Sequence, residues 1–135
     1  MGSCYRFTCD HCGFSFNASG PWEFYRDRAG TLKHYGHPIP ASEEARAAGV
    51  YGMYGRFFCL NCEHEVEIIL REARSPVRDS LLLWMGAYEP KERVGGDYRC
   101  PCCSGKNILL FPEDPPHECP HCVAGRLIGV LEWIS

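Results

Sequence analysis

The chain has 135 residues, of which 45% are hydrophobic and 23% are charged, so its composition is that of a globular protein and excludes a disordered or fibrous chain. This length forms one domain or two very small ones, and small domains usually need a staple in addition to their hydrophobic core. Ten cysteines can supply that staple. The net charge of −3 argues against broad electrostatic binding of nucleic acid, which depends on Lys and Arg contacts to phosphates.

The N-terminal residues lack the charged segment and apolar run of a secretory signal. The longest apolar stretch, from Leu81 to Ala87, is far shorter than the ~20 residues that span a bilayer. We therefore expect a cytoplasmic protein that is not inserted in a membrane. In such a reducing compartment, regularly spaced cysteines bind metal or perform redox chemistry more often than they form structural disulfides.

The first feature along the chain is a Cys-x-x-Cys pair, Cys9 and Cys12. This spacing is typical of a metal knuckle, a tight turn that directs both sulfur atoms toward one ion. Three more pairs follow, so the same prediction applies four times along the chain.

A hairpin and a short helix are predicted after the first knuckle. Residues 22–26 and 31–35 alternate as strands do, and a turn that contains glycine separates them. Ser42 can cap a helix over residues 43–48, and Gly49 is suited to end it. These elements would form an insertion between the first two knuckles.

Residues 49–58, which mix aromatic side chains with glycines, precede the second knuckle, Cys59 and Cys62. The favoured interpretation of this segment is a strand packed on a small lobe. The alternative is an exposed segment that docks a partner or stacks bases. Beyond the knuckle, the alternation in residues 65–71 predicts a returning strand.

A bridging helix is predicted in the middle of the chain. Ser75 is suited to its cap and Pro76 to its first position, and the helix would run to Met85. From Leu81 to Met85 it is apolar on every side, and such a helix needs cover all round. We therefore expect it to contact another protein or a second copy of the chain. Residues 89–97, with one Pro and two Gly, indicate a linker.

The third and fourth knuckles give the strongest local signal. Fifteen residues, 104–118, separate Cys103 from Cys119, which matches the C-x2-C-x15–20-C-x2-C spacing typical of zinc sites. Short strands are expected at residues 107–111 and 127–134.

Four knuckles supply eight sulfur ligands, enough for two tetrahedral sites. We expect knuckles that are consecutive in the chain to share a site, because this closes the shortest loops at the smallest entropic cost. The predicted metal ligands are Cys9, Cys12, Cys59 and Cys62 at one site and Cys100, Cys103, Cys119 and Cys122 at the other.

The predicted fold class is a small mixed α/β protein, β-leaning and metal-stabilised, in which a helix joins two zinc-ribbon lobes. Residues 1–74 would form an N-terminal zinc ribbon with an inserted hairpin and short helix. Residues 75–97 would form the bridging helix and linker. Residues 98–135 would form the C-terminal zinc ribbon.

The segment from Tyr98 to Cys122 resembles a zinc ribbon and, more weakly, the cysteine-rich CPCC domains of bacteria. The N-terminal segment with Cys9-Asp-His-Cys12-Gly13 is similar to the first knuckle of rubredoxins, which hold a redox iron with four cysteines. The second knuckle departs from that family, because no glycine follows Cys62. These resemblances imply metal binding, by zinc as in the ribbons or by iron as in rubredoxins.

We expect two Zn2+ ions, with iron at one or both sites as the alternative, because tetrathiolate geometry suits both ions while closed structural sites are most often zinc. Sulfur would fill every coordination position, so we expect no catalytic residues at these centres. Each zinc with four thiolates carries a charge of about −2, so two such centres would take the net charge from −3 to about −7.

The predicted function is a zinc-binding, non-catalytic binding or adaptor module, for protein rather than nucleic acid. One alternative is a rubredoxin-like iron electron carrier. Another is a nucleic-acid-binding zinc ribbon, whose candidate contacts are Arg26, Arg28, Lys33 and Arg56.

Several residues with metal-binding chemistry have no assigned role. Cys102 could replace Cys103 as a ligand, but the spacing repeated in the other knuckles favours Cys103. Cys4 is unassigned. His34 and His37 could meet only across a turn, and a further metal site there is an alternative interpretation.

Overall fold

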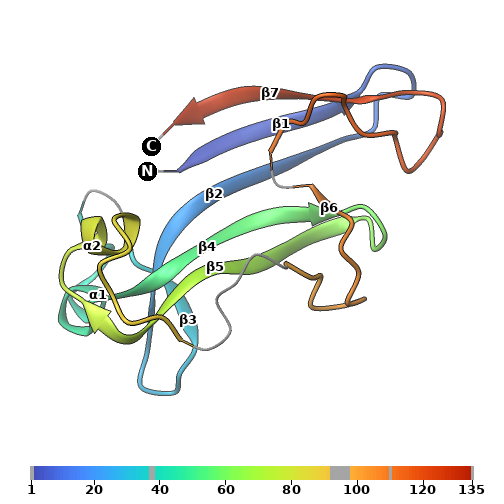
Figure 1. Ribbon diagram of the computed structural model, residues 1–135. Helices are drawn as coiled ribbons and strands as arrows, with labels where there is room; N and C mark the ends of the chain where they lie inside the picture. Colours follow the sequence, from blue (N-terminus) through green and yellow to red (C-terminus); the bar gives the residue numbers. More distant parts are fainter. Residues whose placement is uncertain (1, 37–38, 92–97, 110, 135) are drawn as a thin grey trace. The chain divides into compact units, whose positions relative to one another are not determined.

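The computed structural model describes residues 2–36, 39–91, 98–109 and 111–134 (Figure 1). Strands dominate the described part of the chain, and its two helices are short. The elements in order are β1 (Ser3–Cys9), β2 (Ser15–Arg26), β3 (Leu32–His34), α1 (Glu43–Ala48), β4 (Val50–Cys59), β5 (His64–Val77), α2 (Ser80–Trp84), β6 (Ile108–Leu109) and β7 (Leu127–Ile134). The strands follow the order β5-β4-β2-β1-β7, with β3 paired to β2 and β6 paired to β4. Neither helix of the described residues has the length and hydropathy needed to cross a membrane.

The chain divides into two compact units, each assembled from separate stretches. The first, which we call the cysteine-free unit, comprises residues 21–55 and 69–96. The second, the cysteine unit, comprises residues 2–20, 56–68 and 97–135 and contains all ten cysteines. The strands β2, β4 and β5 contribute residues to both units.

This division of the chain into units differs from the consecutive ranges 1–74, 75–97 and 98–135 expected from the sequence. The reason is that the long strands β2, β4 and β5 each continue from one unit into the other. A hairpin such as β4–β5 gives its turn to the cysteine unit and its other end to the cysteine-free unit.

Within the described stretch 39–91, the helix expected to join two lobes is not found. Ser75 and Pro76 lie in β5, which continues to Val77. The short helix α2 begins after Asp79, whose carboxylate accepts a hydrogen bond from the Leu81 backbone N–H at 2.9 Å. Aspartate caps helices as well as serine does, so the helix starts later than predicted. It has five residues and lies within the cysteine-free unit.

The predicted hairpin and first helix are confirmed. Strands β2 and β3 pair antiparallel, and the Asp27 carboxylate supports their turn by accepting two backbone N–H bonds at 2.9 Å. Ser42 caps α1 by accepting a hydrogen bond from the Ala45 N–H at 3.0 Å. Gly49 ends the helix with φ 80°, a conformation that glycine adopts at little cost.

The later strands agree with the sequence except in length. The returning strand is β5, which is longer than predicted, and the closing strand is β7. The strand expected at residues 107–111 is the two-residue β6, and residue 110 lies outside the described residues. Most of the predicted linker, residues 92–97, also lies outside them.

The core of the cysteine-free unit combines strand and helix residues. Val50, Met53, Ala73 and Leu83 form a buried cluster. The segment 49–58 therefore contains a packed strand, β4, with most side chains buried, as the favoured interpretation expected. In α2, Leu83 is fully buried, whereas Leu81 and Trp84 are exposed, as is Met85 directly after the helix.

Two charged side chains, those of Glu23 and Glu72, are buried in the described part of this unit. Glu72 is 7% exposed, and its Oε1 lies 2.6 Å from Arg26 Nε and 3.4 Å from Lys91 Nζ. Burial alone would raise the pKa of Glu72. The hydrogen bond and charge of Arg26, supported by Lys91, outweigh burial and lower that pKa.

Replacing Glu72 with Gln should lower the free energy of unfolding by about 1.5–3 kcal/mol at pH 7, the usual contribution of a hydrogen bond between charged groups. Because the folded pKa lies below the ordinary value of 4.5, this stabilisation is present above that pH and is lost as the pH falls through the folded pKa. Urea unfolding of both proteins between pH 7 and pH 3 should show the difference shrinking. The exposed Glu43→Gln variant is the control, and a difference independent of pH would contradict the assignment.

Candidate metal centres

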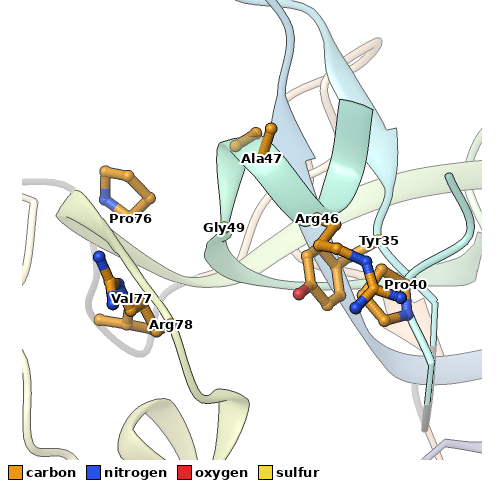
Figure 2. A pocket seen from close by; sticks show the side chains of 9 residues that line it. Tyr35, Pro40, Arg46, Ala47, Gly49, Pro76, Val77 and Arg78 are labelled. Atoms are coloured by element: carbon orange, nitrogen blue, oxygen red, sulfur yellow. The ribbon is translucent and has the colours of Figure 1, made fainter. Parts of the chain in front are cut away.

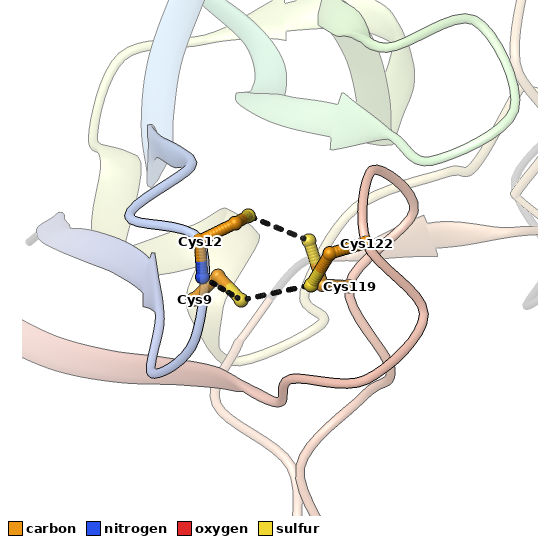
Figure 3. Close-up of side chains that lie close together, drawn as sticks. All are labelled: Cys9, Cys12, Cys119 and Cys122. Carbon is orange, nitrogen blue, oxygen red and sulfur yellow. Dashed lines mark hydrogen bonds between the residues drawn. The ribbon is translucent and has the colours of Figure 1, made fainter.

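Two groups of four cysteines bring their sulfur atoms together within the cysteine unit. In each group the four Sγ atoms lie within 4.8 Å of one another. Tetrad A consists of Cys9, Cys12, Cys119 and Cys122 (Figure 3). Tetrad B consists of Cys59, Cys62, Cys100 and Cys103. All eight cysteines predicted from the knuckle spacing are therefore placed in a tetrad.

The pairing of the knuckles is nested, and the predicted sequential coupling is wrong. The first knuckle meets the fourth, and the second meets the third. Loop entropy disfavours this pairing only slightly, because each doubling of loop length costs about 0.6 kcal/mol. Strand pairing decides it: β7 pairs with β1 and places Leu127 opposite Cys9, while β6 pairs with β4 and places Ile108 opposite Cys59.

Both tetrads have the same strand arrangement. In tetrad A, the knuckle of Cys9 and Cys12 forms the turn between β1 and β2, and the knuckle before β7 completes the set. In tetrad B, the turn between β4 and β5 carries Cys59 and Cys62, and the knuckle before β6 completes the set. In each case the last strand runs antiparallel to the first strand of the hairpin.

Equivalent backbone hydrogen bonds join the two knuckles of each tetrad. The residue after the first cysteine donates its N–H to a carbonyl next to the closing strand. In tetrad A, Asp10 donates to Arg126 at 3.1 Å, and in tetrad B, Leu60 donates to Asn107 at 2.9 Å. The C-terminal segment thus provides one half of both centres.

The residue that follows each knuckle has a left-handed backbone. The φ angles are 79° at Gly13, 57° at Glu63, 59° at Ser104 and 61° at Val123. A residue other than glycine loses about 1–2 kcal/mol in this conformation, and a β-branched side chain is the least suited to it. Three of the four knuckles therefore hold a strained residue, which persists only where the surrounding structure fixes it.

The sulfur separations fit a metal ion and do not fit disulfides. In tetrad A, Sγ of Cys9 lies 3.6 Å from that of Cys122, and Sγ of Cys12 lies 3.6 Å from that of Cys119 (Figure 3). The corresponding separations in tetrad B are 3.7 and 3.8 Å. A disulfide bond is about 2.05 Å long. A tetrahedral ion with metal–sulfur bonds of about 2.3 Å sets its sulfur atoms about 3.8 Å apart.

Backbone N–H groups favour ionised sulfur in both tetrads. Sγ of Cys9 accepts hydrogen bonds from the N–H of His11 at 3.3 Å and of Cys12 at 3.4 Å. The bond from Cys12 lowers the pKa of Cys9 to about 6, and the bond from the Cys103 N–H lowers the pKa of Cys100 to about 6. The thiolate is the form that ligates metal, so these N–H groups favour the form of the cysteine that binds the ion.

A polar and aromatic contact links the two tetrads inside the cysteine unit. His121, which lies within the fourth knuckle, places Nε2 2.7 Å from Oε1 of Glu63, the residue after the second knuckle. The His121 ring stacks on Phe14 with centroids 3.9 Å apart. Phe16 stacks at the same distance on Phe58, which directly precedes Cys59. His121 therefore supports the knuckles and replaces no cysteine.

The two remaining cysteines lie outside the tetrads. Cys102 is exposed, whereas Cys103 joins tetrad B, as the repeated spacing favoured. Cys4 is buried in β1, and its Sγ lies 3.9 Å from a carboxylate oxygen of Glu132. Burial raises the pKa of the Cys4 thiol, so this thiol is less ready to ionise than an exposed one.

The histidine pair considered as a further metal site is not brought together in the described residues. Nδ1 of His34 lies 3.1 Å from the Tyr54 hydroxyl, and His37 lies outside the described residues. Within the described ranges, the two tetrads are the groups of three or more His, Cys, Asp or Glu side chains whose ligand atoms converge.

A cavity of about 550 Å3 lies in the cysteine-free unit (Figure 2). Arg46 and Tyr35 are on one side of it, and Val77 and Arg78 are on the other. Arg46 lies 3.8 Å from Glu43 in an exposed ion pair. The arginines are exposed, and the cavity contains no cysteine of either tetrad.

Gly125 is a residue that the sequence analysis missed. A Cβ atom at this position would overlap Sγ of Cys9 and lie 2.8 Å from Cβ of His11. The close approach of the two knuckles in tetrad A therefore requires glycine here. Its place three residues after the last cysteine was the available signal, but that signal has no meaning until the first and fourth knuckles are known to meet.

Replacing Gly125 with Ala should weaken metal binding by tetrad A and leave tetrad B loaded, because the added methyl group displaces the Cys9 sulfur. Titration with a chelator should then release one metal ion per chain more readily than the other. The matched control is Gly13→Ala, beside the same tetrad, where a Cβ meets nothing within 4 Å and the cost is confined to the backbone. Equal resistance of the two variants to the chelator would contradict this role of Gly125.

Comparison with known proteins adds no family to this description. Searches against protein-family models, curated proteins and solved structures gave no match. The chemistry of the two cysteine tetrads is therefore the basis for a functional assignment.

Proposed function

We propose that the protein binds two metal ions, one in each tetrad, and that both are zinc ions in structural centres. The observation that carries the proposal is the gathering of eight sulfur atoms into two sets with separations of 3.6–3.8 Å. Closed sites of four cysteines are typical of structural zinc. Each tetrad, with its hairpin and antiparallel third strand, also has the arrangement expected of a zinc ribbon.

The burial of the ligands supports a structural role. The first cysteine of every knuckle is buried, with exposed fractions of 3% at Cys9, 0% at Cys59, 1% at Cys100 and 1% at Cys119. The second cysteines are exposed or half-buried. An ion in each tetrad would thus join buried and surface sulfur atoms. It would fix the knuckles and contribute folding free energy directly.

A catalytic role at these centres is disfavoured by the donor set. Four sulfur atoms complete a tetrahedral shell, and a catalytic zinc keeps one position for water or substrate. We propose that the centres instead hold loops in place and that the protein is a non-catalytic binding or adaptor module for another protein.

The alternative of nucleic-acid binding has less support. Arg26 is paired with buried Glu72, Lys33 lies 3.6 Å from Asp27, and Arg56 lies 3.6 Å from Glu67. Basic side chains that are paired with carboxylates contribute less to phosphate binding. Two zinc–tetrathiolate centres would also add charges of about −2 each to a chain whose net charge is −3.

The purified protein should be colourless and contain two zinc ions per chain. Removal of zinc by a chelator should abolish cooperative unfolding of the cysteine unit, because the ions replace much of a core. Elemental analysis and circular dichroism measure these outcomes. The variants Cys4→Ser and Cys102→Ser, whose thiols lie outside the tetrads, should keep both ions. A red protein that bleaches with reductant would instead establish the iron electron carrier, and a metal-free folded protein would contradict both.

A further inference from the structure

A second cavity, of about 680 Å3, lies in the cysteine unit, and its walls come from both tetrads. Leu60 and Asn61, inside the second knuckle, form one wall, and Cys119 and Pro120 of the fourth knuckle form another. Its volume falls within the range of about 300–1,000 Å3 that is typical of ligand sites. We call it the intertetrad cavity.

The lining combines apolar surface with side-chain amides. Leu60 is 7% exposed and gives a nearly buried apolar contact, and Pro115 adds to it. Asn61 and Asn107 also line the cavity, with Nδ2 of Asn107 3.5 Å from Oδ1 of Asn61. An amide side chain both donates and accepts hydrogen bonds, as a peptide group does. This combination suits an extended peptide segment with an apolar side chain.

Val123 stands at the edge of the same cavity in an unusual state. It is β-branched, has a φ of 61°, and is 67% exposed. A β-branched residue with a positive φ has a strained backbone, and its apolar side chain is in unfavourable contact with water. A bound apolar side chain would cover Val123.

The charge of the lining favours a positive ligand. Three carboxylates line the cavity, at Glu113, Asp114 and Glu118. The lining also holds the guanidinium of Arg126 and the ring of His117, whose Nε2 lies 2.7 Å from Oε2 of Glu113. Arg126 lies 3.7 Å from Glu118, so these two opposite charges partly balance each other. Cys119 of tetrad A and the knuckle residues Leu60 and Asn61 beside tetrad B line the cavity, and each tetrad would carry a charge of about −2 when loaded with zinc. A cleft with one sign of charge concentrates ligands of the opposite sign.

We propose that the intertetrad cavity binds a positively charged peptide segment of a partner protein, with an apolar residue against Leu60 and Val123 and flanking Arg or Lys side chains near Asp114 and Glu118. This inference rests on the proposed function, because the metal ions hold the walls and the zinc–tetrathiolate centres supply much of the negative charge. The same charge repels phosphates, so a nucleic acid does not fit this cavity.

The probe is a fluorescently labelled nine-residue peptide in a Gly-Ser background. It carries a leucine with one arginine on each side. Two matched peptides carry Glu or Gln in place of both arginines. Fluorescence anisotropy with zinc-loaded protein should show the arginine peptide binding at least about tenfold more tightly than the glutamate peptide. Binding should weaken as salt is added, because exposed charges are screened.

The double variant Asp114→Asn with Glu118→Gln should weaken binding of the arginine peptide about fivefold to tenfold, through the loss of two carboxylate charges. The control variant, Glu43→Gln with Glu89→Gln, removes the same charge from exposed residues of the cysteine-free unit and should bind as the parent does. The variant Val123→Ser should weaken all three peptides to a similar degree, since it removes apolar contact without changing charge.

Metal content measured on every sample separates the two proposals. Equal binding of the three peptides by protein with two zinc ions would overturn the inference and leave the proposed function intact. Fewer than two ions per chain would overturn the proposed function itself. Tighter binding of a labelled single-stranded oligonucleotide than of the arginine peptide would also overturn the inference, because it would show that the charge of the cavity does not select the ligand.

Discussion

Four sulfur atoms within 4.8 Å of one another are the constraint around which the cysteine unit is built. Four thiolates at this distance repel one another, and an ion with two positive charges offsets that repulsion. Backbone N–H groups offset only part of this repulsion. They donate hydrogen bonds to sulfur and lower the pKa of Cys9 and Cys100 to about 6. The left-handed residues after the knuckles and the close approach at Gly125 are further consequences of the same convergence.

The nested pairing gives the C-terminal segment a central role. Residues 98–134 contribute one knuckle to each hairpin, through β6 on β4 and through β7 on β1. Two lobes that each closed on themselves would be independent. Here the same segment connects both centres, and His121 with Glu63 adds a direct contact between them. A cavity with walls from both tetrads is possible because of this arrangement, which offers a reason for one small chain to hold two such centres.

Local patterns predicted local structure well. The Cys-x-x-Cys spacing identified eight sulfur atoms that gather, and the Ser42 cap and the Asp27 turn were recognisable because their chemistry lies within a few residues. The coupling of the knuckles was not predictable in this way, because pairing of β1 with β7 joins residues more than a hundred positions apart. Loop entropy was too weak a guide to replace it. The helix start predicted at Ser75-Pro76 was wrong for the opposite reason. These residues are typical of a helix start, but they lie in β5, which continues to Val77 as part of the sheet.

The nested coupling can be tested by counting metal ions in two double variants with native mass spectrometry. Cys12→Ala with Cys119→Ala removes two ligands from the same tetrad, so one ion per chain should remain. Cys12→Ala with Cys62→Ala removes one ligand from each tetrad, so neither centre should stay fully coordinated and both ions should be lost. The reverse result, with both ions lost from the first variant and one retained in the second, would establish sequential coupling and contradict the nested pairing of the knuckles.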